Sequence, residues 1–141
     1  KREDETMTLI VCLDDQNGMA FNHRRQSKDR VVTQDILDLT ADSQLYLYEY
    51  SKSLFEEEIK NIKISKDPFA EAKEADYILV EIQTVDLSDP DIEQLIVYRW
   101  NRIYPSDVKL VIGENWKLAE SIDFAGYSHE KITKERYVRR S

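Results

Sequence analysis

The feature that most constrains the fold is a short apolar run, LIVCL at residues 9–13. Five residues are too few for a helix, and the β-branched members favour a strand that is covered on both faces. Asn17-Gly18 follows shortly and predicts a turn with a positive φ angle. A basic segment, residues 23–30, comes next in a chain that is otherwise acidic. The pattern predicts a buried strand that delivers a basic loop to one edge of a sheet, where open α/β folds place ligands.

Length and charge limit the classes of protein that this chain can belong to. The 141 residues fit one α/β domain, which we expect to span residues 8–141 after a short leader at residues 1–7. A formal net charge of −8 argues against general nucleic-acid binding, because phosphates would be repelled. The single cysteine, Cys12, indicates a reducing compartment, and no apolar run approaches the ~20 residues of a membrane span. We therefore expect a cytoplasmic protein that does not bind membranes.

The spacing of apolar residues predicts helices and strands in alternation. Val32, Ile36 and Leu39 share one helical face, and either Ser27 or Asp29 is a suitable N-cap for that helix. Alternation implies right-handed parallel crossovers, and the strand-rich end implies a hairpin added to the sheet edge. The predicted helices span residues 31–39, 51–60 and 68–74. The predicted strands span residues 44–50, 61–65, 76–82 (central), 93–100, 108–112, 116–124 and 131–138 (an edge strand), and residues 85–91 are a loop or a short helix.

The order of these segments resembles the dihydrofolate reductase family over residues 8–138. TLIVCLDDQNGMAFN is similar to that family's first strand and the mobile loop after it, and ADYILVEIQ is similar to its central strand. DILDLTADSQLYLYEYSKSLF resembles its first helix, second strand and the start of its second helix. The family's closing β-hairpin region is similar to three stretches of this chain, IEQLIVYRWNRIYPSDVKLVI, WKLAESIDF and HEKITKERYV. The resemblance implies a three-layer α/β fold: a mixed eight-stranded sheet, parallel with an antiparallel C-terminal hairpin, and helices on both faces.

The residues that would bind the family's cofactor differ in this chain. The family holds the phosphates of its nicotinamide cofactor at glycine-containing turns after the second and central strands, where backbone N–H groups approach the phosphates closely. The matching turns here contain no glycine and carry the carboxylates Glu49 and Glu81. Asp35 is the nearest match to the family's substrate-binding acid, but the match needs a gap of about a helical turn. We therefore expect no cofactor.

A second resemblance rests on three strings, GMAFNHRRQSKDR, YRWNRIYPSD and SHEKIT. They are similar to a looser family of small bacterial proteins, some of which are described as a tRNA-processing metallo-ribonuclease. Zinc chemistry of that kind needs a cluster of histidine and aspartate ligands, and this chain has only His23 and His129. The sequence therefore predicts no metal site.

The first group of candidate ligand-binding residues is basic and follows the first strand. Arg24, Arg25 and Arg30 stand among further cations, and arginine favours bidentate binding of phosphate or carboxylate. The alternative is that these cations pair with the chain's surplus carboxylates and so close the ancestral cofactor cleft. The candidate carboxylates for that pairing are Asp14, Asp15, Glu49 and Glu81.

A second group, Arg99, Asn101 and Arg102, surrounds Trp100, which is more often a core residue than a stacking platform for a base. A third candidate is His129, as a general acid or base, because the reference pKa of histidine lies near neutrality. The commoner alternative for His129 is a solvated loop position, and its serine neighbour makes no catalytic triad without an orienting acid.

These features lead to one main functional hypothesis and two alternatives. The main hypothesis is a non-catalytic protein of the dihydrofolate reductase fold that binds a basic protein partner, for example a toxin-neutralising immunity protein, through Tyr46, Tyr48 and Tyr50. The first alternative is an enzyme or sensor for a small anionic, nucleotide-like ligand, with the arginines as ligands and His129 as proton carrier. The second alternative is an NADPH-dependent reductase.

Overall fold

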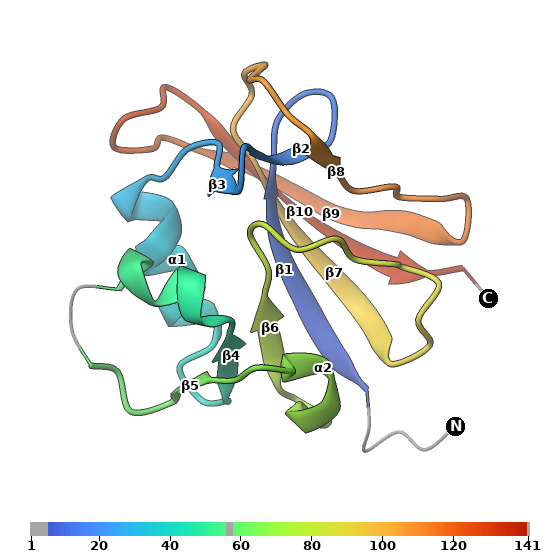
Figure 1. Ribbon diagram of the computed structural model, residues 1–141. Helices are drawn as coiled ribbons and strands as arrows, with labels where there is room; N and C mark the ends of the chain where they lie inside the picture. Colours follow the sequence, from blue (N-terminus) through green and yellow to red (C-terminus); the bar gives the residue numbers. More distant parts are fainter. Residues whose placement is uncertain (1–5, 56–57, 141) are drawn as a thin grey trace.

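The structure, a computed structural model, describes residues 6–55 and 58–140. Within these ranges seven strands form one sheet in the order β5-β4-β6-β1-β7-β10-β9 (Figure 1). The strand β1 lies in the middle and runs parallel to both β6 and β7, whereas β10 is antiparallel to β7 and to β9. The strands are β1 (Met7–Leu13), β4 (Leu45–Leu47), β5 (Ile62–Ile64), β6 (Tyr77–Leu79), β7 (Ile92–Arg99), β9 (Trp116–Phe124) and β10 (Ile132–Arg139).

A second, three-stranded sheet lies across the carboxyl end of β1 (Figure 1). Its strands are β3 (Arg24–Arg25), β2 (Gly18–Phe21) and β8 (Val108–Lys109), in that order. Asn17 carries the predicted positive φ, of 60°, in the turn that leads into β2. Gly18 is required for close approach, because a Cβ there would lie 2.6 Å from the Gln26 side chain.

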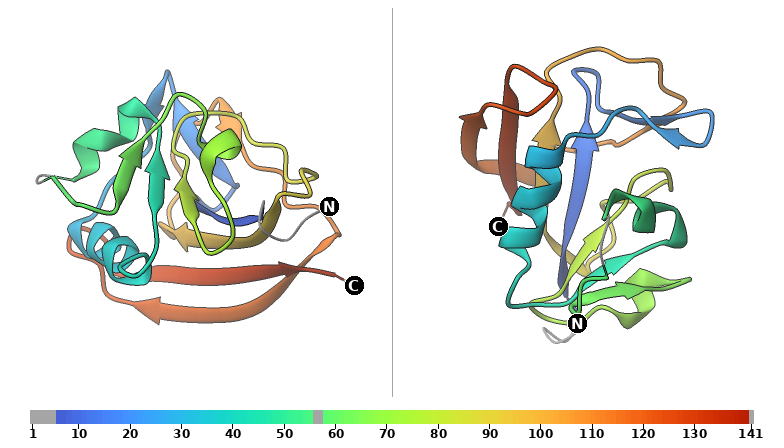
Figure 2. Two further views of the ribbon diagram at one scale, coloured as in Figure 1. Left: turned by 90° about the horizontal axis from the view of Figure 1, so that it is seen from below. Right: turned by 90° about the vertical axis from the view of Figure 1, so that its left-hand side faces the viewer.

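Helices cover both faces of the main sheet, as the right-hand view of Figure 2 shows. The amphipathic helix α1 (Arg30–Leu39) buries Val32 and Ile36 in one core, together with Ile10 of β1. The short helix α2 (Pro68–Glu71) lies on the other face, where Leu9 and Val11 of β1 belong to a second core. Alternate residues of β1 therefore enter different cores, which confirms that this strand is covered on both faces.

Several predicted elements differ from the structure. Seven strands, not eight, form the main sheet among the described residues, and β8 belongs to the smaller sheet. β1 is the middle strand, with β6 beside it, and β10 is an interior strand because β9 takes the edge position. The first strand begins at Met7, one residue before the predicted domain boundary. Residues 85–91 form a loop, which is one of the two predicted alternatives.

The region after β4 differs most. The strand predicted at residues 44–50 ends at Leu47, and the helix predicted at residues 51–60 is replaced by η2, a 3-10 helix at Glu49–Leu54. Ser51, the first residue of that predicted helix, lies inside η2, and its buried hydroxyl has no hydrogen-bond partner among the described residues. Residues 56–57 of the predicted helix lie outside the described residues. Among the described residues no helix is long and apolar enough to cross a membrane.

Candidate functional site

The three strings of the second resemblance meet at the carboxyl end of β1, around two buried carboxylates. The first is Asp14, which is fully buried and accepts hydrogen bonds from the backbone N–H groups of Gly18 (2.8 Å) and Tyr104 (3.1 Å) and from Gln26 Nε2 (3.0 Å). Burial alone would raise the pKa of Asp14, but the backbone donors Tyr104 and Gly18 outweigh it and lower the pKa. Asp14 is therefore an ionised residue that joins the loops after β1 and after β7.

The second buried carboxylate, Asp29, caps α1 and fastens the turn between β9 and β10 to the helix start (Figure 1). Its Oδ1 accepts from the N–H groups of Val31 and Tyr127, and its Oδ2 from the N–H of Ser128, each at 2.9 Å. The turn comes this close because residue 126 is glycine: a Cβ on Gly126 would lie 2.7 Å from Asp29 Oδ2. Asp29, rather than Ser27, is thus the N-cap.

His129 completes this cluster. It is 4% exposed and stacks on Trp100 with 4.7 Å between the ring centroids. Its Nδ1 lies 2.8 Å from Asp29 Oδ2, and its Nε2 lies 3.0 Å from Ser27 Oγ and 3.3 Å from the Tyr104 hydroxyl. The prediction of a solvated loop histidine is therefore wrong, and the orienting acid that the sequence did not reveal is Asp29.

The hydrogen-bond pattern fixes the state of this histidine. Burial opposes ionisation of Asp29, but donation from the Tyr127 N–H, His129 and the Ser128 N–H lowers its pKa well below the usual range. Since the Asp29 carboxylate can only accept, Nδ1 of His129 must donate to it. In the neutral ring, Nε2 then carries the free lone pair and accepts from the hydroxyl of Ser27 or Tyr104. This is an acid–base arrangement with a preset tautomer.

On the other side of β1, an ion pair fills the place where the resemblance implied a cofactor. Arg25 Nε lies 2.8 Å from Glu81 Oε2, and Arg25 Nη2 lies 3.0 Å from Oε1. Glu81 is 8% exposed, and the Arg25 guanidinium also lies 4.6 Å above the centre of the Tyr50 ring. The Tyr50 hydroxyl accepts from the Arg25 backbone N–H. Of the four carboxylates proposed to close the cleft, Glu81 is the one that pairs with Arg25.

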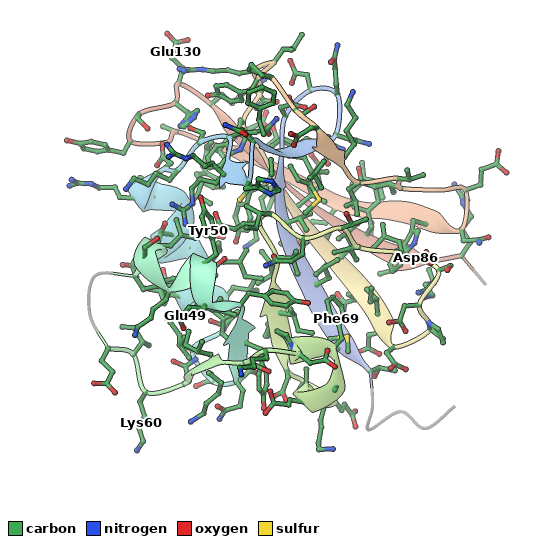
Figure 3. All side chains as sticks on the ribbon, viewed as in Figure 1. Glu49, Tyr50, Lys60, Phe69, Asp86 and Glu130 are labelled. Carbon is green, nitrogen blue, oxygen red and sulfur yellow. The ribbon has the colours of Figure 1, made fainter. Side chains whose placement is uncertain are left out.

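The residues around this pair do not fit a nicotinamide dinucleotide. The chain's three glycines, at positions 18, 113 and 126, lie neither after β4 nor after β6. Glu49 begins η2, and no helix start follows β6 to present free N–H groups to a phosphate. A shallow groove of about 590 Å³ remains beside η2, where Figure 3 labels Glu49 and Tyr50. It is lined by Tyr48, Glu49, Tyr50, Ile64, Ser65, Lys66 and Gln83.

Of the predicted arginines, some are committed to the structure and others are exposed. Arg99 donates to Glu135 at 2.8 Å and to the backbone oxygen of Asp14, so it joins β7 to β10 and to the loop after β1. Arg24, Arg30 and Arg102 are exposed, and none of them forms an ion pair with a carboxylate in the described part of the chain. Arg30 lies over the Tyr127 ring, and Arg102 donates to the Ser128 carbonyl at 3.4 Å.

The remaining predicted residues have structural positions. Asn101 has a φ of 58° and donates to the Lys131 carbonyl and to Thr133 Oγ1, so it holds the loop after β7 against β10. Asp35 lies on α1 and accepts from the Tyr98 hydroxyl and from Lys134 rather than facing an open cleft.

The three tyrosines predicted to anchor a partner are half-buried. Tyr46 and Tyr48 pack against the core on the α2 face, and Tyr50 lies under Arg25. Tyr50 belongs to η2, so it does not continue the alternation of a strand.

Sequence reasoning missed the roles of Ser27, Asp29 and Tyr104. Ser27 and His129 are 102 positions apart, and no local spacing connects them. The sequence does contain one signal for the cluster, the two polar residues Ser27 and Asp29 before a helix. The spacing there indicates only that either residue is a suitable N-cap. Trp100 was correctly interpreted as a core residue, since it is 3% exposed.

Comparison with known proteins shows the fold. The chain matches the structure of a dihydrofolate reductase from Enterococcus faecalis complexed with NADP(H) and RAB-propyl, with a TM-score of 0.66 and 10% sequence identity. The match covers 98% of each chain. No family model matches the sequence, and no curated protein matches it. The protein therefore has a dihydrofolate reductase-like fold.

Because Arg25 and Glu81 form an ion pair, we expect substitutions at the two residues to have strongly coupled effects on the free energy of unfolding. Replacing Arg25 with Met leaves the Glu81 carboxylate buried without its partner, so R25M and E81Q should each destabilise the fold, whereas the double variant should recover part of the loss. We expect a coupling free energy of about 1–3 kcal/mol in urea unfolding. Arg24→Met, which removes the exposed neighbouring arginine, serves as control and should change stability by less than about 0.5 kcal/mol. Simple additivity of the two single variants would contradict the prediction.

Asp29 predicts a specific pH dependence. Because its folded-state pKa is lowered, the unfolded chain binds the proton more readily than the folded chain does. The stability that Asp29 contributes is therefore present above about pH 4 and is lost as the pH falls through the folded pKa. Asp29→Asn should destabilise the protein by about 1–3 kcal/mol at pH 7 and make the acid limb of the stability profile shallower. Asp38→Asn, at an exposed position on the same helix, should leave that limb unchanged.

Proposed function

We propose that this protein binds a small anionic ligand at the carboxyl end of β1 and uses His129 as its proton carrier. The observation that carries the proposal is the buried Asp29–His129 pair, whose Nε2 is directed at the hydroxyls of Ser27 and Tyr104. Because Nδ1 is engaged by Asp29, the neutral ring presents the lone pair of Nε2 to these hydroxyls.

The charges around the cluster support an anionic ligand. Lys28 and Arg30 flank Asp29 in sequence, Lys131 follows His129 by two positions, and Arg102 contacts the neighbouring Ser128 carbonyl. All four cations are exposed, in a chain whose formal net charge is −8. The nearby carboxylate Glu130 points out of the molecule (Figure 3). Arg25 and Arg99 are left out of the proposed ligand set, because Glu81 and Glu135 already occupy their guanidinium groups.

Thermal and chemical unfolding in the presence of pyrophosphate, ATP and NADPH test this function. A ligand at 100 times its Kd should add about 2.7 kcal/mol to the free energy of unfolding. We expect pyrophosphate or ATP to stabilise the wild type but not an R30A/R102A variant. A K63A/K117A variant, which removes two exposed cations from β5 and β9, should bind as the wild type does. Absence of stabilisation by any anion contradicts the proposal, and stabilisation by NADPH alone favours the reductase alternative.

A second candidate function is binding to a basic protein partner, as a toxin-neutralising immunity protein does. It is favoured by the acidic net charge and by the exposed edge strand β9, on which Leu118 and Ile122 are 47% and 53% exposed. The three half-buried tyrosines offer less side-chain surface than these two residues do.

Capture of the tagged protein from its host, with mass spectrometry of the bound chains, tests the second candidate. We expect a stable basic polypeptide that is lost with Ile122→Lys but retained with Val111→Lys, which changes another exposed aliphatic residue away from β9. If no polypeptide is retained at low ionic strength, the protein-binding role is wrong.

A further inference from the structure

We propose that Ser27 is a nucleophile that is activated by His129 and Asp29. It accepts the acyl group of an ester substrate that carries a negative charge. This inference rests on the proposed anion site at His129 and adds a reaction to it. The cluster contains the three groups that such a reaction needs: a hydroxyl, a base within hydrogen-bond distance of it, and an acid that orients the base.

The geometry selects one serine of the two in the cluster. Ser27 Oγ lies 3.0 Å from Nε2 of His129, the nitrogen that is free to accept a proton. Ser128 Oγ donates to Asp29 Oδ2 at 3.2 Å and lies 3.3 Å from Nδ1, which itself donates to Asp29, so no free imidazole lone pair faces the Ser128 hydroxyl. Tyr104 is a longer second contact of Nε2, at 3.3 Å. His129 is therefore placed to deprotonate Ser27 and not Ser128.

The surroundings of His129 favour transfer of a proton to it. The Asp29 side chain is fully buried and held ionised by backbone N–H donors, so its negative charge stabilises an imidazolium at 2.8 Å with little screening by water. Stacking on Trp100 and hydrogen bonds at both nitrogens prevent the ring from turning. The base is thus oriented before any substrate arrives, which lowers the entropic cost of the reaction.

Loss of the Ser27 hydroxyl leaves the structural contacts of Asp29 in place, and the Tyr104 hydroxyl remains as a partner of His129 Nε2. Asp29 caps α1 and binds the β9–β10 turn whether or not residue 27 has a hydroxyl group. In the described part of the chain, Ser27 Oγ has no hydrogen-bond partner other than His129 Nε2. Ser27 is also partly exposed, whereas His129 is buried, so Ser27 is the member of the pair that a substrate meets first.

The proposed reaction balances with water as the only co-reactant. Ser27 Oγ forms a bond to the carbonyl carbon while its proton moves to His129 Nε2. The carbon–oxygen bond to the leaving alcohol then breaks, and His129 returns the proton to that oxygen. Water, deprotonated by the same nitrogen, then attacks the acyl carbon, and the bond from that carbon to Ser27 Oγ breaks. His129 returns the proton to Ser27 Oγ as the carboxylic acid is released. Lys28, Arg30 and Arg102 favour substrates with a phosphate or carboxylate group beside the ester.

Covalent labelling with a fluorophosphonate probe tests the nucleophile directly. Ser27 Oγ forms a bond to phosphorus and fluoride leaves, so intact mass and peptide mapping detect the adduct and its position. We expect one adduct, on Ser27, that is absent from Ser27→Ala. Ser121→Ala, at an exposed position on β9 outside the cluster, is the control and should label at the wild-type rate, whereas His129→Asn should label at least about 100-fold more slowly. Circular dichroism and urea midpoints establish that each variant is folded.

A second variant avoids any change to the supporting residues. In Ser27→Cys, the new thiol should be alkylated by iodoacetamide much faster than Cys12, because burial and the nearby Glu81 raise the pKa of the Cys12 thiol. Equal slowness of both thiols, together with unlabelled wild-type Ser27, overturns the inference. If anions bind but Ser27 does not react, the binding site stands and the nucleophile is wrong. If Ser27 reacts but no anion binds, the ligand class is wrong and the nucleophile stands.

Discussion

The structure depends most on the Asp29 carboxylate, which holds together two segments that are far apart in sequence. It caps α1, accepts two backbone N–H groups from the turn between β9 and β10, and orients His129. A buried charge is stable only when its hydrogen-bonding capacity is satisfied, and here both oxygens have several donors. The consequence is that the turn of the antiparallel hairpin is fixed to the start of α1 at this carboxylate. Any chemistry at His129 inherits its geometry from that same point.

Two charged pairs on either side of β1 have opposite effects on what this edge of the sheet can bind. Arg25 and Glu81 satisfy each other, so neither offers charge to a ligand, and the cofactor side of the scaffold is closed. Asp29 and His129 also satisfy each other, but the imidazole has a second nitrogen that remains chemically useful. The Arg25 guanidinium, in contrast, has no lone pair that could accept a proton. The proposed chemistry therefore lies on the β7 and β10 side of β1.

The sequence predicted the fold well because hydrophobic periodicity is a local signal. The apolar run in β1, the helical face of Val32 and Ile36, and the alternation in β9 and β10 each placed an element correctly. Prediction failed where an element is short or its position is set by distant partners: η2 replaced a helix, and β10 became an interior strand. Pairing of the basic segment with carboxylates at this edge of the sheet was a predicted alternative, and the structure shows that Arg25 and Glu81 form such a pair. The His129 cluster was not predicted, because its members come from three separate loops and only tertiary folding brings them together.

The position of Asp29 also explains why a resemblance to a reductase does not transfer its substrate-binding acid. Asp35, the nearest sequence match, is engaged by Tyr98 and Lys134. Asp29 does stand at the start of the first helix, yet its oxygens are already saturated by donors from within the protein. A carboxylate in that condition cannot bind a ligand without losing hydrogen bonds that stabilise the fold. It acts on a ligand only through another group, and His129 is the group that it holds. Ser27 is then the member of the described cluster at which a substitution should remove the proposed reaction while the hydrogen bonds of Asp29 that stabilise the fold are kept.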